Sequence, residues 1–356
     1  MAGDLRGEGT PTQRAETDGA DARRADEVPK RALADVLDEL AETHQLRHEE
    51  ERGSGSEVRI FDPRSGNHAT VGSVVLKRPA ADDASRAREV VEQLVACRAA
   101  ATGAGVQPIA AEPLVWGEDP AFVLYRYLDG ALLSDEIKRV LTADPSGRAR
   151  VLALARQAGE VIARYHEAVD ASAEAPSIVF ERIPARSRYL RFAGVHGGTP
   201  PSVVRSFIDP EAHNMVLDPS GTLMLIDFPE EHRVAPPGRD LGVLAFFLVR
   251  QSRGAGDGAI RRLGSRTVVP AVVAGYGAAR DLPPELRHAI EADAHAYFGV
   301  RAMDRVARDC RRVVKTVRGR GEGSAGLPRP LRTVRLTGWM FESLLLSRVM
   351  RLRRRG

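Results

Sequence analysis

The sequence predicts an α+β protein with two lobes, in which a small antiparallel sheet with one helix precedes a larger, mostly helical part. Two observations support this prediction. Between residues 56 and 130, short β-branched and apolar runs alternate with turn-forming residues and enclose one helical segment. After Gly130, apolar residues recur at helical spacing. The chain of 356 residues is long enough for two lobes, since a domain usually holds roughly 100 to 200 residues.

The first element that we expect is a helix after a disordered start. Residues 1–30 have almost no large apolar side chains and cannot bury enough surface to offset the entropy cost of ordering. The next segment, "RALADVLDELAETHQL", predicts a short amphipathic helix. Its apolar residues at helical spacing are Leu33, Val36, Leu37 and Leu40.

The sheet is predicted from four strand-like runs around one helix. Val58–Phe61 and Val71–Leu76 flank the turn formers "DPRSGN", which indicates a hairpin that ends at Lys77. "DASRAREVVEQLVACRAAAT" predicts a helix, with Ser85 as a candidate cap. "LVWGEDPAFVLYRYLDG" then contributes two more strands around Gly117 and Pro120.

The second lobe is predicted to be helical. "RARVLALARQAGEVIARYHEAV" is the clearest amphipathic helix, and residues 171–202 have no clear period. Four further helical patterns follow, at 238–252, 267–280, 284–319 and 331–355. We therefore divide the chain into a disordered segment (1–30), a nucleotide-binding lobe with its leading helix (31–128), a catalytic and substrate lobe (129–320) and a basic C-terminal helix (321–356).

Composition narrows the class of protein. The best apolar run, 241–249, is far shorter than the roughly 20 residues that cross a bilayer, and the start has no apolar region typical of a secretory signal, so we expect a cytoplasmic location. Cys97 and Cys310 stand far apart without metal-ligand spacing, which predicts reduced thiols.

Positive charge is concentrated at the C-terminus. Residues 301–356 hold 16 Arg and Lys against 4 Asp and Glu, within a chain of net charge +4. Such a segment suits nucleic acid, an anionic membrane or an acidic partner equally well, and nothing else in the chain indicates nucleic acid. Leu336, Trp339, Met340, Leu344 and Met350 alternate with Arg, which fits a helix on a membrane surface; the alternative is a terminal helix that packs on the lobe.

The stretch "IDPEAHNMVLDPSGTLMLIDFP", residues 208–229, contains the candidate chemistry. Two strand-like runs joined by a Pro-Ser-Gly turn predict a hairpin, at whose ends Asp and Asn could simply be solvated. Phosphoryl transfer is the alternative explanation for these Asp and Asn side chains, because Mg²⁺ is bound by oxygen ligands and a carboxylate orients the acceptor hydroxyl. Asn214 and Asp227 are the candidate metal ligands, and Asp209 is the candidate catalytic residue.

Residues upstream fit the same chemistry. Lys77, at the end of an apolar strand, suits a contact with nucleotide phosphates, and Glu89 or Glu92 on the next helix could pair with it. We favour Glu89. Gly53 and Gly55, before the first strand, could let backbone amides approach phosphate. Each feature also has a plainer interpretation, as a solvated strand end, a surface helix face and a flexible turn.

The order of these residues resembles the protein-kinase-like superfamily, especially the aminoglycoside and choline-type phosphotransferases and the RIO-like atypical kinases. The resemblance covers about residues 50–290. It implies a bilobal protein-kinase-like fold, ATP and Mg²⁺ as cofactors, and a structural role for Asp240. Phe207-Ile208 replaces the His-Gly that the family has before its catalytic Asp. Only 12 residues separate Asp227 from Asp240, which argues against an ordinary Ser/Thr protein kinase.

The sequence thus predicts an ATP- and Mg²⁺-dependent phosphotransferase that acts on a hydroxyl of a small molecule. The alternatives are an atypical RIO-like protein serine/threonine kinase and a pseudokinase-type binding module, the latter favoured by Phe207-Ile208. His213 and His166 are interpreted as packing residues rather than catalytic ones.

Overall fold

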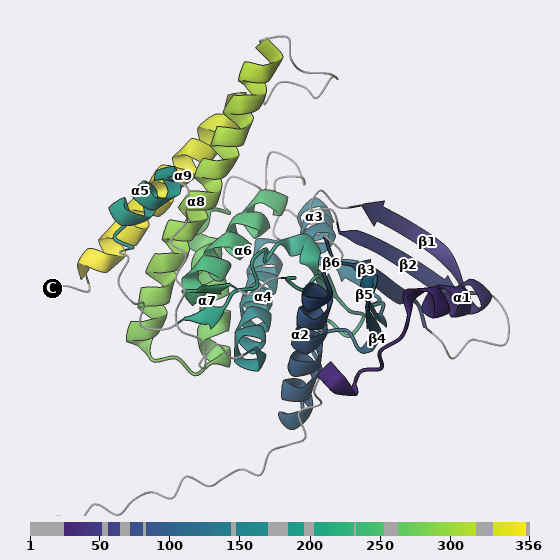
Figure 1. Cartoon of the computed structure of the whole chain (residues 1–356). Coiled ribbons are helices and arrows are strands. Elements are labelled where there is room, and N and C mark those ends of the chain that lie inside the picture. The colour runs from purple at the N-terminus through teal and green to yellow at the C-terminus, as the bar shows by residue number, and fades with distance from the viewer. Residues whose placement is uncertain are drawn as a thin grey trace, which may run out of the picture.

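The protein has a sheet-rich part and a helical part that lie side by side (Figure 1). The computed structural model describes residues 25–51, 56–64, 72–80, 83–143, 147–169, 184–195, 203–230, 233–252, 263–317 and 330–353. This arrangement confirms the predicted α+β architecture, with a small antiparallel sheet before a larger helical part.

Five antiparallel strands form the sheet in the order β1-β2-β3-β5-β4. Lys77 pairs in register with Val58 on one side and with Val123 on the other, so it lies on the central strand. The strand bounds are β1 His44–Glu51, β2 Glu57–Pro63, β3 Val74–Arg78, β4 Pro113–Glu118 and β5 Ala121–Arg126.

Each face of the sheet is covered by one helix. Side chains alternate between faces along a strand, so Val74 and Leu76 of β3 pack in one cluster with α1 (Leu33–Thr43). Val75 packs in the other cluster, which contains the apolar side of α2 (Ala84–Gly103). Lys77 shares the pleat of Val75 and therefore lies on the α2 side of the sheet.

The helical part surrounds α4 and α6. α4 packs against α7, α6 against α8, and α9 runs along α8 on the side away from the sheet (Figure 1). None of the described helices is long and apolar enough to cross a membrane. The helix bounds are α3 Leu133–Ala143, α4 Arg148–Ala168, α5 Pro184–Phe192, α6 Pro237–Gln251, α7 Ser265–Ala279, α8 Pro284–Val317 and α9 Pro330–Arg353.

α4 and α7 approach each other closely through two glycines. A Cβ at Gly159 would collide with the backbone of Val272, and a Cβ at Gly275 with the backbone of Arg156. The missing side chains let the two backbones touch, which fixes the spacing of this helix pair.

Short strands in the described residues form two further small sheets. β8 (Met215–Leu217) pairs with β9 (Leu223–Leu225) and with β6 (Ala131–Leu132), while β7 (Val204–Arg205) pairs with β10 (Val234–Ala235). The β8–β9 turn is held by Asp218, whose carboxylate accepts from Ser220 Oγ (2.6 Å) and from the amide of Thr222 (2.8 Å). The hairpin predicted from the sequence is therefore present.

The N-terminal segments differ from the predictions in three places. His44–Leu46, expected in a helix, begin β1, a strand that the sequence did not predict because its residues, "HQLRHEEE", are polar. β1 is an edge strand, where exposed charged side chains are common. Asp83 rather than Ser85 caps α2, accepting from the Ser85 amide at 2.9 Å. Residues 25–30, placed in the disordered segment, contain a 3-10 helix (Ala25–Glu27) and a bridge to Trp116; residues 1–24 lie outside the described residues.

The C-terminal helix packs on the lobe, as in the second of the two interpretations. Trp339, Met340 and Leu344 contact the hydrophobic clusters, and the Trp339 ring lies edge-on to Phe298 with centroids 5.8 Å apart. These apolar residues therefore stabilise the helical part rather than face a membrane. Both cysteines are free thiols, as predicted, with Cys97 buried and Cys310 exposed.

Candidate active site

Lys77 lies at the centre of a buried group of charges. Its side chain is 5% exposed, and Nζ lies 2.9 Å from Asp227 Oδ1 and 3.3 Å from Glu230 Oε1. Nζ also donates to the carbonyl of Phe228 at 3.1 Å. Burial by itself would lower the pKa of Lys77, but the charges of Asp227 and Glu230 outweigh it and raise that pKa. Lys77 is therefore a buried cation.

Glu89 is buried, and its carboxylate accepts a hydrogen bond from Gln93 Nε2 at 2.8 Å. The same nitrogen donates to the carbonyl of Pro229 at 2.8 Å. Lys77 forms ion pairs with Asp227 and Glu230, and the pairing of Glu89 with Lys77 stays a prediction. Glu92 is exposed and pairs with Arg88, which agrees with the choice of Glu89 as the inward glutamate.

The β8–β9 register brings Asn214 next to Asp227. Met215 pairs with Leu225, and the amide of Ile226 donates to the carbonyl of Asn214 at 3.1 Å. Ile226 therefore pairs with Asn214, and Asp227 is the next residue along the chain. Asn214 is buried, and its Nδ2 donates to the carbonyl of Asp209 at 3.0 Å, which turns its Oδ1 to the other side of the amide.

This pair of side chains fits a magnesium ion. Mg²⁺ usually takes one or two carboxylates from a protein and completes its shell with water and phosphate oxygens. An amide oxygen and a carboxylate on adjacent strand ends are the oxygen donors that it prefers. Within the described residues there is no group of three or more His, Cys, Asp or Glu side chains that could hold a metal by themselves.

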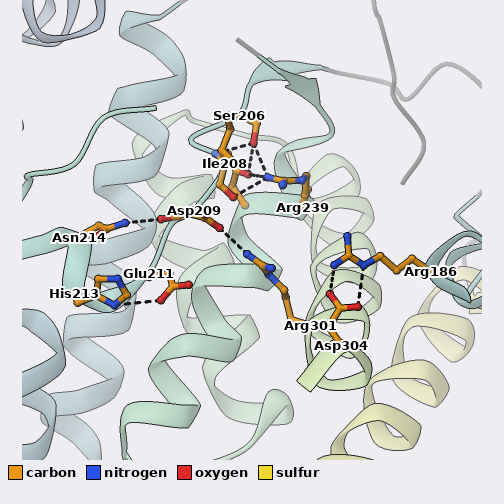
Figure 2. Close-up of polar contacts among 11 residues, drawn as sticks. Arg186, Ser206, Ile208, Asp209, Glu211, His213, Asn214, Arg239, Arg301 and Asp304 are labelled. Atoms are coloured by element: carbon orange, nitrogen blue, oxygen red, sulfur yellow. Dashed lines mark hydrogen bonds and ion pairs between the residues drawn. The ribbon is translucent and has the colours of Figure 1, made fainter. Parts of the chain in front are cut away.

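Asp209 lies on the exposed side of the same loop. Its side chain is 61% exposed, and Oδ1 lies 2.7 Å from Nη2 of Arg301, which reaches it from α8 (Figure 2). The backbone carbonyl of Asp209 accepts from Asn214, so the two residues share one rigid turn. The loop thus presents the Asp209 carboxylate to solvent beside a guanidinium group.

The buried Asp240 holds this loop in place through hydrogen bonds. It is fully buried, and its carboxylate accepts from the amide of Phe207 (2.7 Å), Ser206 Oγ (2.7 Å) and Arg239 Nη1 (2.9 Å). Burial alone would raise its pKa, but the hydrogen bond from His166 Nε2 and the charge of Arg239 lower it. The structural role that the resemblance implies for Asp240 is therefore visible in its contacts.

Phe207-Ile208, which stands where the resembled family has His-Gly, combines a packed aromatic ring with an unusual backbone conformation. The buried Phe207 ring packs edge-on to Tyr165 and Phe228, with centroids 5.1 Å and 6.0 Å away. Ile208 adopts φ +64°, a left-handed conformation that costs a β-branched residue roughly 1 to 3 kcal/mol. Arg239 donates to the Ile208 carbonyl at 3.2 Å and helps to hold this turn (Figure 2).

Two neighbours of Asp209 are titratable. Glu211 Oε2 lies 3.2 Å from His213 Nδ1 (Figure 2). Burial and the charge of Asp209 raise the pKa of Glu211 to about 7, although Arg301, Arg250 and Arg308 act in the opposite direction. Glu211 is thus an acid kept partly neutral beside several arginines.

The sequence missed several residues of this site, and two proposed residues lie outside the described residues. Glu230 pairs with Lys77 and also lies 3.6 Å from Arg86 Nη1, while Arg301 pairs with Asp209. Neither residue belongs to a short motif. The sequence signal for Glu230 is its position directly after "DFP". Gly53 and Gly55 lie outside the described residues, so their role stays a prediction.

Known proteins were compared with the chain by sequence and by structure. No family model and no curated protein sequence matches it. Its structure matches the choline kinase LicA from Streptococcus pneumoniae, with 12% identity, a TM-score of 0.40 and coverage of 88% of this chain and 98% of that one. A type VIII aminoglycoside-3'-phosphotransferase matches with 16% identity, a TM-score of 0.42 and coverage of 75% and 99%. A Plasmodium vivax ethanolamine kinase matches with 10% identity, a TM-score of 0.40 and coverage of 88% and 84%.

At these identities and TM-scores the likeness is distant, and it says nothing about the activity of this chain. The matching structures also include the kinase domain of Mycobacterium tuberculosis PknI, with 18% identity, a TM-score of 0.35 and coverage of 72% of this chain and 87% of that one.

Proposed function

We propose that the protein is an ATP- and Mg²⁺-dependent phosphotransferase that moves the γ-phosphoryl group of ATP to a hydroxyl of a small molecule. One observation carries the proposal. Lys77 and Asp227, 150 residues apart in the chain, meet at 2.9 Å in a part-buried position. The β8–β9 register brings Asn214 beside Asp227, and Asn214 Nδ2 donates to the carbonyl of Asp209 at 3.0 Å. A lysine, two oxygen donors and an exposed carboxylate are the parts that phosphoryl transfer needs.

Each residue has a distinct role in this proposal. Lys77 binds the phosphates of ATP, and Asn214 and Asp227 hold the metal. Bound Mg²⁺ would neutralise charge on the phosphates. Asp209 orients the acceptor hydroxyl and accepts its proton while the oxygen attacks the γ-phosphorus. Asp240 holds the loop so that Asp209 and Asn214 keep their relative positions.

The test separates nucleotide binding from transfer. ATP with Mg²⁺ should raise the melting temperature of the wild type, since a ligand of the folded state stabilises it. Asp227→Ala should lose this stabilisation. Asp209→Ala should keep it, while ADP release in the presence of alcohols falls roughly 10²- to 10⁴-fold.

Asp135→Ala is the matched control for Asp209→Ala. The Asp135 side chain is 60% exposed, and within the described residues it has one ion pair, to Lys138 at 2.7 Å on α3. It should leave ATP turnover unchanged. Full turnover by Asp209→Ala would refute the assignment of that residue. Stabilisation by ATP without turnover of any acceptor, protein or small molecule, would favour the pseudokinase-type binding module instead.

A further inference from the structure

We infer that the phosphate acceptor is an acid, a hydroxyl compound with a carboxylate or phosphate group, and that Arg301 is the residue that binds this acidic group. The inference rests on the proposed function, because it concerns the acceptor side of the same site. It depends on the position of Arg301, on the balance of charge around it, and on the state of Asp209 in the free protein.

The guanidinium group of Arg301 is fixed by its contacts and does not move freely at the surface. Its side chain is only 21% exposed, and its Cζ lies 5.7 Å from the centre of the Phe247 ring. Its Nη2 meets Asp209 Oδ1 at 2.7 Å (Figure 2), and the Asp209 side chain is 61% exposed. An acceptor whose hydroxyl approaches Asp209 must therefore also approach Arg301.

The charges around Arg301 favour an anion. Arg250 lies over the same Phe247 ring at 5.7 Å, and Arg301, Arg250 and Arg308 all act electrostatically on Glu211. The neighbouring acid of α8, Asp304, is already neutralised by two hydrogen bonds from Arg186 (Figure 2).

Arg301, Arg250 and Arg308 thus face two carboxylates, those of Asp209 and Glu211, which leaves arginine in excess around Asp209. A cationic acceptor would place like charges together at this point, which is unfavourable.

An acidic acceptor would also free the Asp209 carboxylate from Arg301, so that it can orient the acceptor hydroxyl. In the free protein one carboxylate oxygen of Asp209 is occupied by Arg301. Arginine binds carboxylate and phosphate groups in a bidentate manner, so an acidic group of the acceptor can take over Nη2. The oxygen of Asp209 that loses this contact then lies beside the bound molecule, where it can accept a hydrogen bond from the hydroxyl.

The experiment compares acceptors that differ in charge. Gluconate and glycerate form the carboxylate arm, glucose 6-phosphate and glycerol 3-phosphate the phosphate arm, glucose and glycerol the neutral arm, and choline and kanamycin the cationic arm. ATP turnover is measured for each with wild type and Arg301→Gln. We expect at least one acid to exceed its neutral analogue, and Arg301→Gln to raise KM for that acid roughly 10- to 100-fold. Arg301→Lys should recover part of this loss, because it restores the charge without the planar fork.

Arg59→Gln is the matched control. The Arg59 side chain is 31% exposed and pairs with Glu49 and Glu57 on the sheet, so this variant removes the same charge away from α8. The acid preference should persist in this variant. If Arg301→Gln lowered turnover of acidic, neutral and cationic acceptors by the same factor, Arg301 would only support the loop, and the inference would be wrong.

Direct binding separates this inference from the proposed function. With the site saturated by a non-hydrolysable ATP analogue and Mg²⁺, the acids are titrated into wild type and Arg301→Gln by calorimetry. Tighter binding of any acid to the wild type supports the inference even without turnover. Equal or absent binding of every acid overturns it while ATP binding stays intact, whereas loss of ATP binding would overturn the proposed function.

Discussion

Replacing Asp240 by asparagine should destabilise the protein far more than the small chemical change suggests. The carboxylate is fully buried, and both of its oxygens are in use. Oδ2 accepts from the amide of Phe207 at 2.7 Å and from His166 Nε2 at 3.0 Å. Oδ1 accepts from Ser206 Oγ at 2.7 Å and from Arg239 Nη1 at 2.9 Å.

The size of the effect follows from counting donors. Asparagine has one acceptor oxygen and one NH₂ group, so in either orientation of the amide two of these donors face another donor. A hydrogen bond to a charged group contributes about 1.5 to 3 kcal/mol, and each unsatisfied buried donor adds a desolvation cost. Asp240→Asn should therefore lower the free energy of unfolding by about 3 to 5 kcal/mol, a large share of the roughly 5 to 15 kcal/mol of a typical domain.

Equilibrium unfolding in urea at pH 7 measures this loss. Asp209→Asn serves as the control, because it makes the same change on the supported loop but removes a single exposed ion pair, which contributes less than about 1 kcal/mol. A loss below about 1 kcal/mol in Asp240→Asn would refute the reasoning. The lowered pKa of Asp240 adds a second readout: its contribution is present above the unfolded value near 3.8 and is lost as the pH falls, so acid should cost the wild type more than the variant.

Three further predictions concern the helical part. Gly275→Ala should cost about 1 to 3 kcal/mol of unfolding free energy in urea, because the added Cβ meets the backbone of Arg156; an unchanged value would mean that α4 and α7 can separate freely. Burial lowers the pKa of His295 to about 4, so the wild type should lose up to about 3 kcal/mol between pH 6.5 and 4 as the unfolded state takes up its proton, and the curve of His295→Leu should be flatter. Trp339→Ala should lower stability by about 2 to 4 kcal/mol by removing the contact with Phe298, whereas a loss below 0.5 kcal/mol would show, on the scale of ordinary surface changes, that α9 is only loosely attached.

Local patterns in the sequence predicted the parts of the fold that local physics determines. The turn residues between Met215 and Leu225 favour a hairpin through local conformation alone. This hairpin brings Asn214 and Asp227 together. The alternation along β3 likewise places Lys77 on the face that α2 covers, because every second side chain of a strand shares a face.

The remainder of the site depends on contacts between distant segments. Arg301 lies in the middle of a 34-residue helix with many arginines, and only the packing of α6 on α8 selects this one to meet Asp209. β1 escaped prediction for a related reason, since its charged residues form a strand only by pairing with β2 at the sheet edge. Tertiary context decided both cases.

The three ion pairs at the site of the free protein have the same consequence for both proposed substrates. Lys77 is neutralised by Asp227 and Glu230, and Asp209 by Arg301. A buried cation without a partner would be very costly, so the folded chain supplies internal partners while no ligand is bound. Binding of ATP or of an acidic acceptor then exchanges one ion pair for another, and the net affinity is the difference between the two. The buried Lys77 group should therefore resist exchange more than the half-exposed Asp209 group, so nucleotide affinity should respond strongly to Glu230→Gln, which leaves Lys77 with one carboxylate fewer to release.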